Sequence, residues 1–246
     1  RELQDFAFVA SHDLQEPLRK IQAFGDRLKA RYAPALADEG RDYLERMQSA
    51  AKRMQTLIND LLAFSRVTTK AQPFVKVDLT RIVNEVISDL EIHIQQVGAQ
   101  VEVNDLPTID ADPLQMRQLL QNLLSNSLKF QRAGISPLIQ IQGKLLKPSE
   151  VSSTLQSSDR PFTSTICQIE VTDNGIGFDE KYLDRIFTVF QRLHGRNEYE
   201  GTGVGLAICR KITERHGGLI TARSQPGEGT TFIIVLPIKQ AGMINF

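Results

Sequence analysis

The fold of this chain is decided by a stretch of ten residues, 121–130, which reads QNLLSNSLKF. Asn122, Asn126 and Lys129 follow one another at steps of four and three residues, so a helix would place them on one face. Leucines fill the other side and predict burial there. Carboxamide oxygens suit Mg²⁺, and a lysine at the next step suits phosphate. A solvated amphipathic helix would show the same spacing, so the stretch needs support from elsewhere in the chain.

Two glycine-containing motifs give that support. Residues 173–177 read DNGIG directly after an apolar strand, so Asp173 can accept a hydrogen bond from an exocyclic amino group while Gly175 and Gly177 let the backbone turn sharply. Residues 201–206 read GTGVGL at a predicted helix start, where backbone amides attract phosphate. Their third glycine is misplaced for a dinucleotide fingerprint, and no strand leads into them. Each motif alone is weak, because a tight turn also explains it.

The segments around these motifs predict a layered α/β sandwich, because strands and helices alternate irregularly. Asp78 or Thr80 is the expected cap of a first helix, and Gly98 its end. The Ser-, Thr- and Pro-rich residues 147–165 are expected to form a long hairpin insertion. Helices are predicted to about 97, over 113–132 and over 204–216, and strands over 75–77, 100–104, 138–145 and 166–172, with two more after 216.

The first 66 residues carry the pattern of two long helices, with a break bracketed by Pro34 and Gly40. Apolar residues recur at steps of three and four, which is the seam of a helical bundle, and a short turn makes the pair an antiparallel hairpin. Leu18, Leu57 and Leu62 widen the stripe, so a homodimer with four helices is expected to cover it. The seam residues are Leu3, Ala7, Ala10, Leu14, Pro17, Ile21, Phe24 and Leu28, then Leu44, Met47, Ala51, Met54, Ile58, Leu61 and Ser65.

His12 lies midway between the seam residues Ala10 and Leu14, which predicts that it points away from the hairpin's own core. A lone histidine on a helix is most often a solvated or packed side chain. Here Asp13 follows directly and can fix the tautomer, leaving the other ring nitrogen nucleophilic. Pro17 costs a helix about 3 kcal/mol, which indicates a bend next to His12.

The composition excludes several kinds of partner. Lys+Arg and Asp+Glu both number 29, so neither nucleic acid nor an anionic membrane is the expected main partner. No apolar run is long enough to span a bilayer. The two distant cysteines predict a reduced, cytoplasmic protein without a metal knuckle. The chain opens directly in a helical pattern, so we expect no signal peptide and a fragment of a longer protein.

In this order and spacing, the motifs resemble the catalytic core of sensor histidine kinases over nearly the whole chain. Residues 11–19, SHDLQEPLR, resemble the family's H box. Residues 11–19 and 190–205 are especially similar to soluble phytochrome-type bacterial kinases. The further matches are the N box at 121–130, the G1 box at 173–177, the F box IFTVF at 186–190, the G2 box at 201–206 and the last glycine motif GEGTTF at 227–232.

The resemblance implies an α+β fold, with an N-terminal helical hairpin that forms a four-helix bundle in the homodimer. The C-terminal part would be an α/β sandwich of the Bergerat ATP-binding type. The implied domains are a dimerisation and phosphotransfer hairpin over 1–67, a linker over 68–76, the ATP-binding domain over 77–240 and a tail over 241–246. The missing upstream part would be the sensor domain.

The resemblance also implies roles for single residues. His12 would accept the phosphoryl group of ATP, with Asp13 orienting or deprotonating it, and would pass the group to an aspartate of a response regulator. Asp173 would bind adenine, Lys129 the phosphates, and Asn122 and Asn126 would hold Mg²⁺ and phosphate oxygens. Further nucleotide contacts would be Gly175, Gly177, Gly201, Thr202, Gly203, Gly205, Leu206 and Thr231, and Arg192, His194 and Arg196 would be lid contacts.

One position departs from many members of the family. They carry Thr or Asn four residues after the histidine, where it positions a water that dephosphorylates a partner. This chain has Glu16 there. The pattern therefore gives no support to a phosphatase activity.

Two other functions fit parts of the sequence. Chaperone and mismatch-repair ATPases of the same nucleotide fold place a glutamate base four residues before the magnesium-binding asparagine. Asn122 stands there in this chain, and an amide cannot take up a proton usefully. A dimeric signalling scaffold with a degenerate nucleotide site is the other possibility, which the intact Asn, Asp and Gly positions disfavour. Whether phosphorylation occurs within one subunit or between two depends on the connection over 32–40, which the sequence leaves open.

Overall fold

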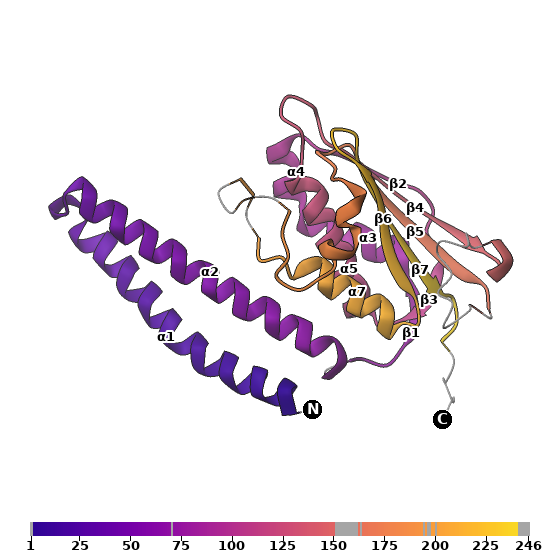
Figure 1. The fold of residues 1–246 in the computed structure, drawn as a ribbon, viewed down its shortest axis with the longest axis horizontal. Coiled ribbons are helices and arrows are strands. Elements are labelled where there is room, and N and C mark those ends of the chain that lie inside the picture. Colours follow the sequence, from indigo (N-terminus) through magenta and orange to yellow (C-terminus); the bar gives the residue numbers. More distant parts are fainter. Residues whose placement is uncertain are drawn as a thin grey trace. The chain divides into compact units, whose positions relative to one another are not determined.

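The computed structural model describes residues 2–69, 71–150, 162, 164–193, 195, 198–199 and 201–240, apart from the side chains of 2–13, 33 and 149. It divides into two compact units, Arg1–Thr69 and Lys70–Phe246 (Figure 1). The expected tail over 241–246 and most of the expected hairpin insertion lie outside the described residues. None of the described helices has the length and apolar character needed to cross a membrane.

The first unit is a hairpin of two long helices, α1 (Glu2–Tyr32) and α2 (Asp38–Thr69), joined through a 3₁₀ turn at Ala33–Ala35 (Figure 1). Leu18 of α1 packs against Ala51, Ile58 and Leu62 of α2. Gly25 lets the helices approach closely, because a Cβ there would lie 2.9 Å from Cγ of Gln48. The hairpin is therefore closed by one apolar row and one close backbone approach.

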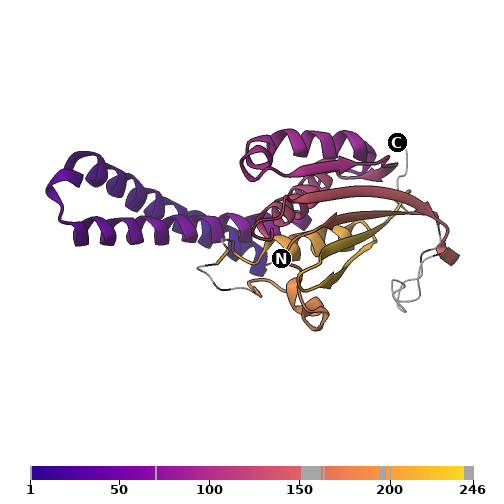
Figure 2. The same cartoon turned by 90° about the horizontal axis from the view of Figure 1, so that it is seen from above.

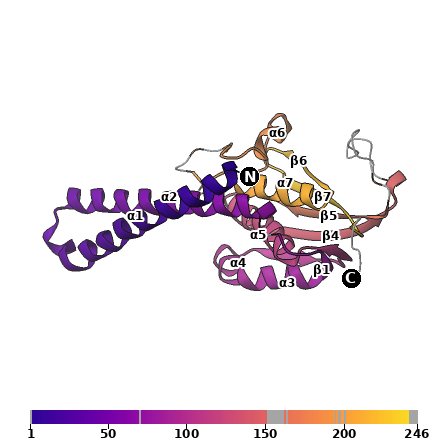
Figure 3. The same cartoon turned by 90° about the horizontal axis from the view of Figure 1, so that it is seen from below.

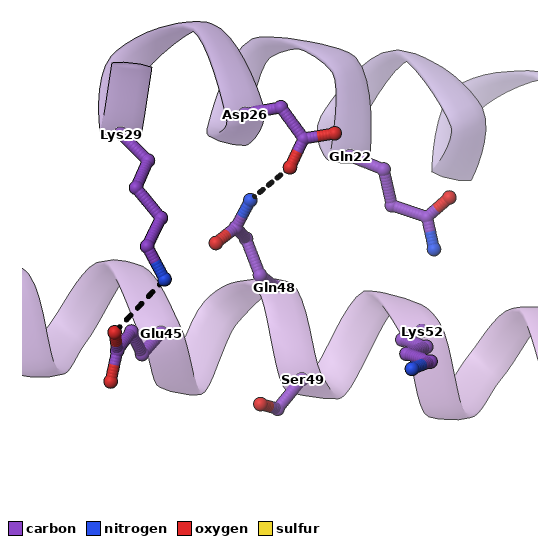
Figure 4. A pocket seen from close by; sticks show the side chains of 7 residues that line it. All are labelled: Gln22, Asp26, Lys29, Glu45, Gln48, Ser49 and Lys52. Atoms are coloured by element: carbon purple, nitrogen blue, oxygen red, sulfur yellow. Dashed lines mark hydrogen bonds and ion pairs between the residues drawn. The ribbon is translucent and has the colours of Figure 1, made fainter. Parts of the chain in front are cut away.

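A polar groove runs along the hairpin between α1 and α2 (Figure 4). Nε2 of Gln48 donates to Oδ1 of Asp26 at 2.7 Å, and Nζ of Lys29 meets Oε1 of Glu45 at 3.0 Å. These contacts join the helices on their solvent side, where ion pairs contribute little, about 0–1 kcal/mol each. The groove is lined by Gln22, Asp26, Lys29, Glu45, Gln48, Ser49 and Lys52.

The expected seam proves to be two rows with different surroundings. Leu44, Ala51 and Ile58, seven residues apart, are buried. Met47 and Met54 are 46% and 48% exposed, although they belong to the same predicted seam. One row closes the hairpin, because two helices in contact each present a single narrow stripe. The row that the single chain leaves exposed consists of Leu14, Ile21, Phe24, Leu28, Met47 and Met54, at 42–60%.

The helix α2 continues past residue 67, where the linker was expected to begin. The hydroxyls of Thr68 and Thr69 bond back to the carbonyl of Ser65, and the helix ends at Thr69. Strand β1 (Val75–Asp78) already begins within the expected linker 68–76. The connection between the two units is therefore shorter than the sequence indicates.

The second unit is built on a five-stranded sheet in the order β2-β4-β5-β7-β6 (Figure 1). Strand β2 runs parallel to β4, and the other neighbours are antiparallel. A separate antiparallel pair joins β1 to β3 (Thr108–Ala111), a strand that the sequence did not predict. The five strands are β2 (Gln100–Val103), β4 (Leu138–Leu146), β5 (Ile166–Asp173), β6 (Leu219–Gln225) and β7 (Gly229–Pro237).

Helices cover one face of this sheet (Figures 2 and 3). The central helix, α5 (Pro113–Lys129), packs between α3 (Leu79–Asp89) and α7 (Gly205–Arg215), and also against β5. Five of its leucines are almost fully buried, and each contributes about 1.5–3 kcal/mol relative to exposure: Leu119, Leu120, Leu123, Leu124 and Leu128. The opposite face carries polar pairs such as Gln142 with Glu170, Nε2 to Oε2 at 2.7 Å. The α/β sandwich thus has its core between the helices and the sheet.

Two predicted helices have different bounds in the structure. The first predicted helix, up to about residue 97, is divided into α3 and α4 (Glu91–Val97). Leu90 separates them: its N–H bonds to carbonyls of the last turn of α3, and α4 starts at the next residue. Gly98, at φ 64°, ends α4 as expected. The second, α5, stops at Lys129 rather than 132, because the carbonyl of Phe130 accepts the N–H of Ile176 at 2.9 Å. A short helix, α6 (Leu183–Ile186), follows a 3₁₀ turn at Glu180–Tyr182.

Candidate functional site

The helix α5 carries the polar face that the sequence singled out. Asp112 caps its start, with Oδ1 accepting from the N–H groups of Leu114 and Gln115 at 3.1 and 3.3 Å. Pro113 occupies the first turn, where its missing N–H costs nothing. Asn122, Asn126 and Lys129 are half-buried on α5. The leucines hold the helix against the sheet and so fix the direction of this polar face.

The three polar side chains differ in what already holds them. Nδ2 of Asn122 donates to the carbonyl of Gly205 at 3.2 Å, which ties α5 to the first residue of α7. The side chain of Asn126 forms no hydrogen bond with any residue that the structure describes. Nζ of Lys129 lies 4.1 Å from the ring centroid of Phe130, and a Cβ added to Gly201 would come within 3.0 Å of it. The ammonium therefore lies against the glycine loop.

The glycine loop is shaped by residues that need left-handed backbone. Gly201 and Gly203 have φ of 141° and 76°. A Cβ on Gly203 would lie 2.6 Å from the carbonyl oxygen of Gln191, which a side chain could not tolerate. Thr202 and Leu206 are half-buried beside them. At Gly201 and Gly203 the backbone of this loop can thus approach a ligand more closely than it could if these positions carried side chains.

Arg192 organises the segment before the glycine loop. Its guanidinium donates to the carbonyl of Gly201 at 2.7 Å, to that of Gly195 at 3.3 Å, and to that of Tyr199. The Tyr199 ring lies 5.0 Å from the Phe130 ring, centroid to centroid. Arg192 therefore holds the backbone of the loop rather than facing open solvent. The other predicted lid contacts, His194 and Arg196, lie outside the described residues.

Asp173 ends β5 and has three hydrogen-bond donors. Oδ1 accepts from the N–H of Gly175 at 2.9 Å and of Thr230 at 3.2 Å, and Oδ2 accepts from Oγ of Ser127 at 3.1 Å. Burial raises the pKa of Asp173 above its usual value, and these three hydrogen bonds oppose the rise. The carboxylate is thus half-buried, oriented and still able to accept one more bond on Oδ2.

The turn after Asp173 is packed too tightly for side chains. A Cβ on Gly175 would lie 2.3 Å from the carbonyl oxygen of Phe130. At Gly177, which has φ 61°, a Cβ would lie 2.1 Å from the carbonyl oxygen of Gln225. Nε of Arg132 donates to the carbonyl of Asn174 at 2.7 Å. The turn is therefore fixed on several sides, with Asp173 at its base.

Thr231, predicted as a nucleotide contact, lies on the face of the sheet opposite to that of Asp173. It pairs with Thr172, and the two hydroxyls are 3.0 Å apart. Successive side chains of a strand point to opposite faces, so Thr230, which pairs with Asp173, is the threonine on the helix-covered side. The adjacent threonines look equivalent in sequence, and only the strand register separates them.

Ser127 and Thr230 are the site residues that the sequence reading missed. Ser127 is only 3% exposed and belongs to the leucine side of α5. A polar residue on an otherwise apolar stripe needs a hydrogen-bond partner, and that signal was present at residue 127. Thr230 contributes its backbone N–H, which no residue type reveals. His12 and Asp13 lie within α1, but their side chains are outside the described part of the chain.

A buried polar cluster fixes the far ends of α5 and α7. Nη1 of Arg215 donates to Oδ2 of Asp112 at 3.1 Å, and Nη2 donates to the carbonyl of Gln72 at 2.8 Å. Nε2 of His216 accepts the N–H of Asp112 at 3.1 Å, so Nδ1 carries the proton and donates to the carbonyl of Ile212 at 2.8 Å. Burial lowers the pKa of His216. Because this cluster joins the two helices, it helps to set the spacing of Asn122 and Gly205.

Comparison with known proteins agrees with this geometry. The family described as histidine kinase-, DNA gyrase B- and HSP90-like ATPase matches residues 111–240, and the His Kinase A (phospho-acceptor) domain matches residues 2–70. The chain is 39% identical over 237 residues to phytochrome-like protein Cph1 of Synechocystis sp., and 40% identical over 237 residues to cyanobacterial phytochrome A of Nostoc sp.. Each alignment covers 96% of this chain and 29% of the relative, so the chain spans less than a third of their length.

The fold has solved counterparts as well. Full-length ShkA in complex with AMPPNP superposes with a TM-score of 0.66 at 23% identity, over 97% of this chain and 46% of ShkA. This likeness concerns the fold, whereas the two domain matches concern the sequence. Together they cover a phosphoacceptor hairpin followed by an ATPase domain. The chain therefore belongs to the histidine kinase family.

Proposed function

We propose that this chain is the catalytic core of a protein-histidine kinase in two-component signal transduction. It transfers the γ-phosphoryl group of ATP to His12 and then to an aspartate of a response regulator. The observation that carries the proposal is the convergence on α5: Asp173 from β5 and the loop of Gly201 both meet this helix. The matched phosphoacceptor domain over residues 2–70 contains His12.

The residues present fit a nucleotide with its metal. Asp173 offers a half-buried, oriented acceptor to the amino group of adenine, and Lys129 beside the loop of Gly201 offers positive charge to the phosphates. Asn126 has no described partner, and the oxygen of Asn122 stays available because its nitrogen bonds to Gly205. These two oxygens would hold Mg²⁺, which when bound neutralises phosphate charge.

The chemistry needs positioning more than covalent participation by the ATP-binding unit. The lone pair of a His12 ring nitrogen forms the N–P bond while the bond from phosphorus to the ADP oxygen breaks. Asp13 holds the other ring nitrogen and offsets the positive charge that the imidazole acquires. Lys129 and the amides of the glycine loop balance the charge on the departing ADP.

We further propose that the protein acts as a homodimer. The two-helix unit exposes an outward row of large apolar side chains, at 42–60% each: Leu14, Ile21, Phe24, Leu28, Met47 and Met54. A second copy would bury this row in a four-helix bundle. We propose in addition that a sensor domain precedes this chain in the whole protein and that a response regulator is its partner. A cytoplasmic location fits the two cysteines, Cys167 and Cys209, which are buried as free thiols.

Replacing His12 tests the central step. The His12→Gln variant should bind ATP with unchanged affinity and incorporate no acid-labile phosphate, since glutamine lacks a nucleophilic nitrogen. His93, on α4 of the other unit, supplies the matched control, and His93→Gln should label like wild type. Undiminished labelling of His12→Gln would sink the assignment.

Steady-state turnover separates the kinase from a related ATPase. A kinase should release little ADP once His12 is replaced, because Asn122 supplies no base for water. We expect ATP hydrolysis by His12→Gln at the background level measured without protein. Sustained hydrolysis by this variant would favour the ATPase function instead.

A further inference from the structure

We propose that Ser127 is a positioning residue for base recognition: its hydroxyl holds the ligand-accepting oxygen of Asp173 and thereby sets the preference for adenine over guanine nucleotides. This inference rests on the proposed binding of ATP at Asp173. Ser127 directly follows Asn126 on α5, so one turn of helix links the phosphate end of the site to the base end.

The hydrogen bonds leave a single place for a ligand on the carboxylate. A carboxylate has about four acceptor positions. The N–H groups of Gly175 and Thr230 take both positions on Oδ1, and Ser127 takes one on Oδ2. The remaining position is on the oxygen that Ser127 holds. The serine hydroxyl therefore fixes the direction from which an amino group of the base must approach.

Among the described residues, Ser127 is also the only side chain that donates to Asp173. The other two donors are backbone amides, which keep their bonds whatever side chains surround them. With 3% exposure, the hydroxyl has no access to water as an alternative partner. Of the three described donors to Asp173, Ser127 is thus the one whose hydrogen bond depends on the identity of its side chain.

The same hydroxyl influences the protonation of Asp173. Donation to a carboxylate favours its ionised form. Arg132, the charged side chain on the neighbouring turn, binds the carbonyls of Asn174 and Gly227 instead, and Lys129 lies against Phe130 and the glycine loop. No ion pair joins Asp173 to a described residue. Loss of the hydroxyl should therefore raise the pKa of Asp173.

Base preference follows from the charge state of this carboxylate. An ionised carboxylate accepts from the amino group of adenine and repels the carbonyl oxygen that guanine has in its place. A protonated carboxyl can instead donate to that oxygen. A variant without the hydroxyl, with a looser and more readily protonated Asp173, should lose ATP affinity and gain relative affinity for GTP.

The test measures ATP and GTP dissociation constants of the full chain by calorimetry from roughly pH 5 to pH 8, a range that includes partial protonation of raised carboxyl groups. The two nucleotides carry the same phosphates, so their ratio isolates the base. Ser127→Ala should weaken ATP binding about tenfold at neutral pH, as expected for a lost bond to a charged group. Its ATP:GTP preference should fall, and its loss of ATP affinity towards acid should begin at higher pH than in wild type.

Ser125→Ala is the matched control, because Ser125 lies on the same helix and makes no described contact with Asp173. It should keep the wild-type affinities, ratio and pH profile. Ser127→Cys retains a buried side chain of similar size with a weak donor, and should lie between wild type and Ser127→Ala. It also keeps the test decisive if the alanine variant does not fold.

The outcomes separate this inference from the proposed function. If Asp173→Asn binds ATP like wild type, the adenine assignment itself fails. If Asp173→Asn loses ATP while Ser127→Ala keeps the wild-type ratio and pH profile, the inference about Ser127 is overturned and the proposed function stands. A Ser127→Cys variant that matches wild type in both measurements would also overturn it, because donor strength would then be immaterial.

Discussion

At the scale of single residues, the site depends on where a Cβ can be accommodated. Gly175 and Gly205 look alike as motif glycines, yet their surroundings differ. A Cβ on Gly175 would lie 2.3 Å from the carbonyl oxygen of Phe130 and 2.8 Å from Oδ1 of Asp173. On Gly205 the nearest atom, Oδ1 of Asn122, would be 3.6 Å away, an ordinary contact. One glycine is required by packing, and the other is not.

Alanine at these two positions should therefore have opposite effects on stability. Gly175→Ala should destabilise the second unit by about 1–3 kcal/mol, because the turn must shift away from α5. Gly205→Ala should be neutral or stabilise by up to about 1 kcal/mol, because alanine favours the helix that starts there. Hydrogen exchange of peptides from α5 and α7 would measure both. Equal effects of the two substitutions would contradict the packing argument.

The sequence was a better guide to the motifs of the candidate site than to the hydrogen bonds between individual residues. Asp173 and the polar face of α5 were singled out because their residue types and spacings carry chemistry, and the structure brings them together through Ser127. Ser127 was overlooked, although its place among leucines was visible. Thr231 was predicted as a contact, whereas Thr230 is the residue paired with Asp173. Strand register, which depends on pairing between residues 57 positions apart, cannot be read from a motif.

At the scale of elements, the joint between the start of α5 and the end of α7 holds the two helices in place. Asp112 is 1% exposed and receives its charge partner, Arg215, from the other helix. Gln72 and Phe74 complete the joint, and the Phe74 ring lies 4.6 Å below the guanidinium carbon. The joint brings together residues that are distant in the sequence, since Asp112 and Arg215 are 103 positions apart.

Breaking this ion pair should be costly. Arg215→Leu would leave Asp112 buried with only backbone amides as donors, those of Leu114, Gln115 and Gln72, and without a charge partner, so we expect a loss of about 2–4 kcal/mol. Arg210→Leu, which breaks an exposed pair with Glu214 on the same helix, should change stability by less than about 0.5 kcal/mol. Hydrogen exchange within α7 would compare the two. A small effect at both positions would show that the buried pair contributes nothing.

His216 gives the joint a dependence on pH. Burial, which disfavours the charged imidazolium, holds the pKa of His216 below its unfolded value of 6.5, and the neighbouring charge of Arg215 acts in the same direction. The stability it contributes is present above pH 6.5 and is lost as pH falls through the folded pKa. The raised pKa of Asp173 acts in the opposite direction, so the comparison must be made against a variant. His216→Gln should have a flatter unfolding free energy below about pH 6.5, and an unchanged acid slope would contradict this.

Element boundaries were predicted where a local signal exists and missed where a distant contact decides. Asp78, Asp112 and Gly98 mark ends that the sequence also marks. The end of α5 is set by Ile176, which the sequence of the helix does not contain. Strand β3 is four residues long and exists through its pairing with β1, so its own pattern was too short to identify it.

At the scale of the whole molecule, the two units bury different proportions of their apolar side chains. The second unit has its core between helices and sheet, whereas the hairpin exposes one of its two apolar rows. The heptad pattern predicted both rows but assigned them to a single seam. A repeat of seven residues shows that a contact exists, and it does not show whether the partner is the same chain or another.

Charge placed in the outward row should dissociate the proposed dimer. Ile21 is 42% exposed, and Ile21→Glu would bury a carboxylate at the contact between copies. Wild type should sediment as a dimer and this variant as a monomer. Ile92→Glu introduces the same charge at a 73% exposed position of α4 and should remain dimeric. A dimeric Ile21→Glu protein in analytical ultracentrifugation would place the contact elsewhere.

The hydrogen-bond donors of Asp173 come from before and after it in the chain, and this affects the order in which the site forms during synthesis. Ser127 lies 46 residues before the aspartate and Thr230 lies 57 residues after it. On the ribosome, α5 and β5 emerge long before β7 has been synthesised. The carboxylate therefore lacks its last donor until β7 has been synthesised, so the geometry around Asp173 is completed only when nearly the whole sheet has been translated.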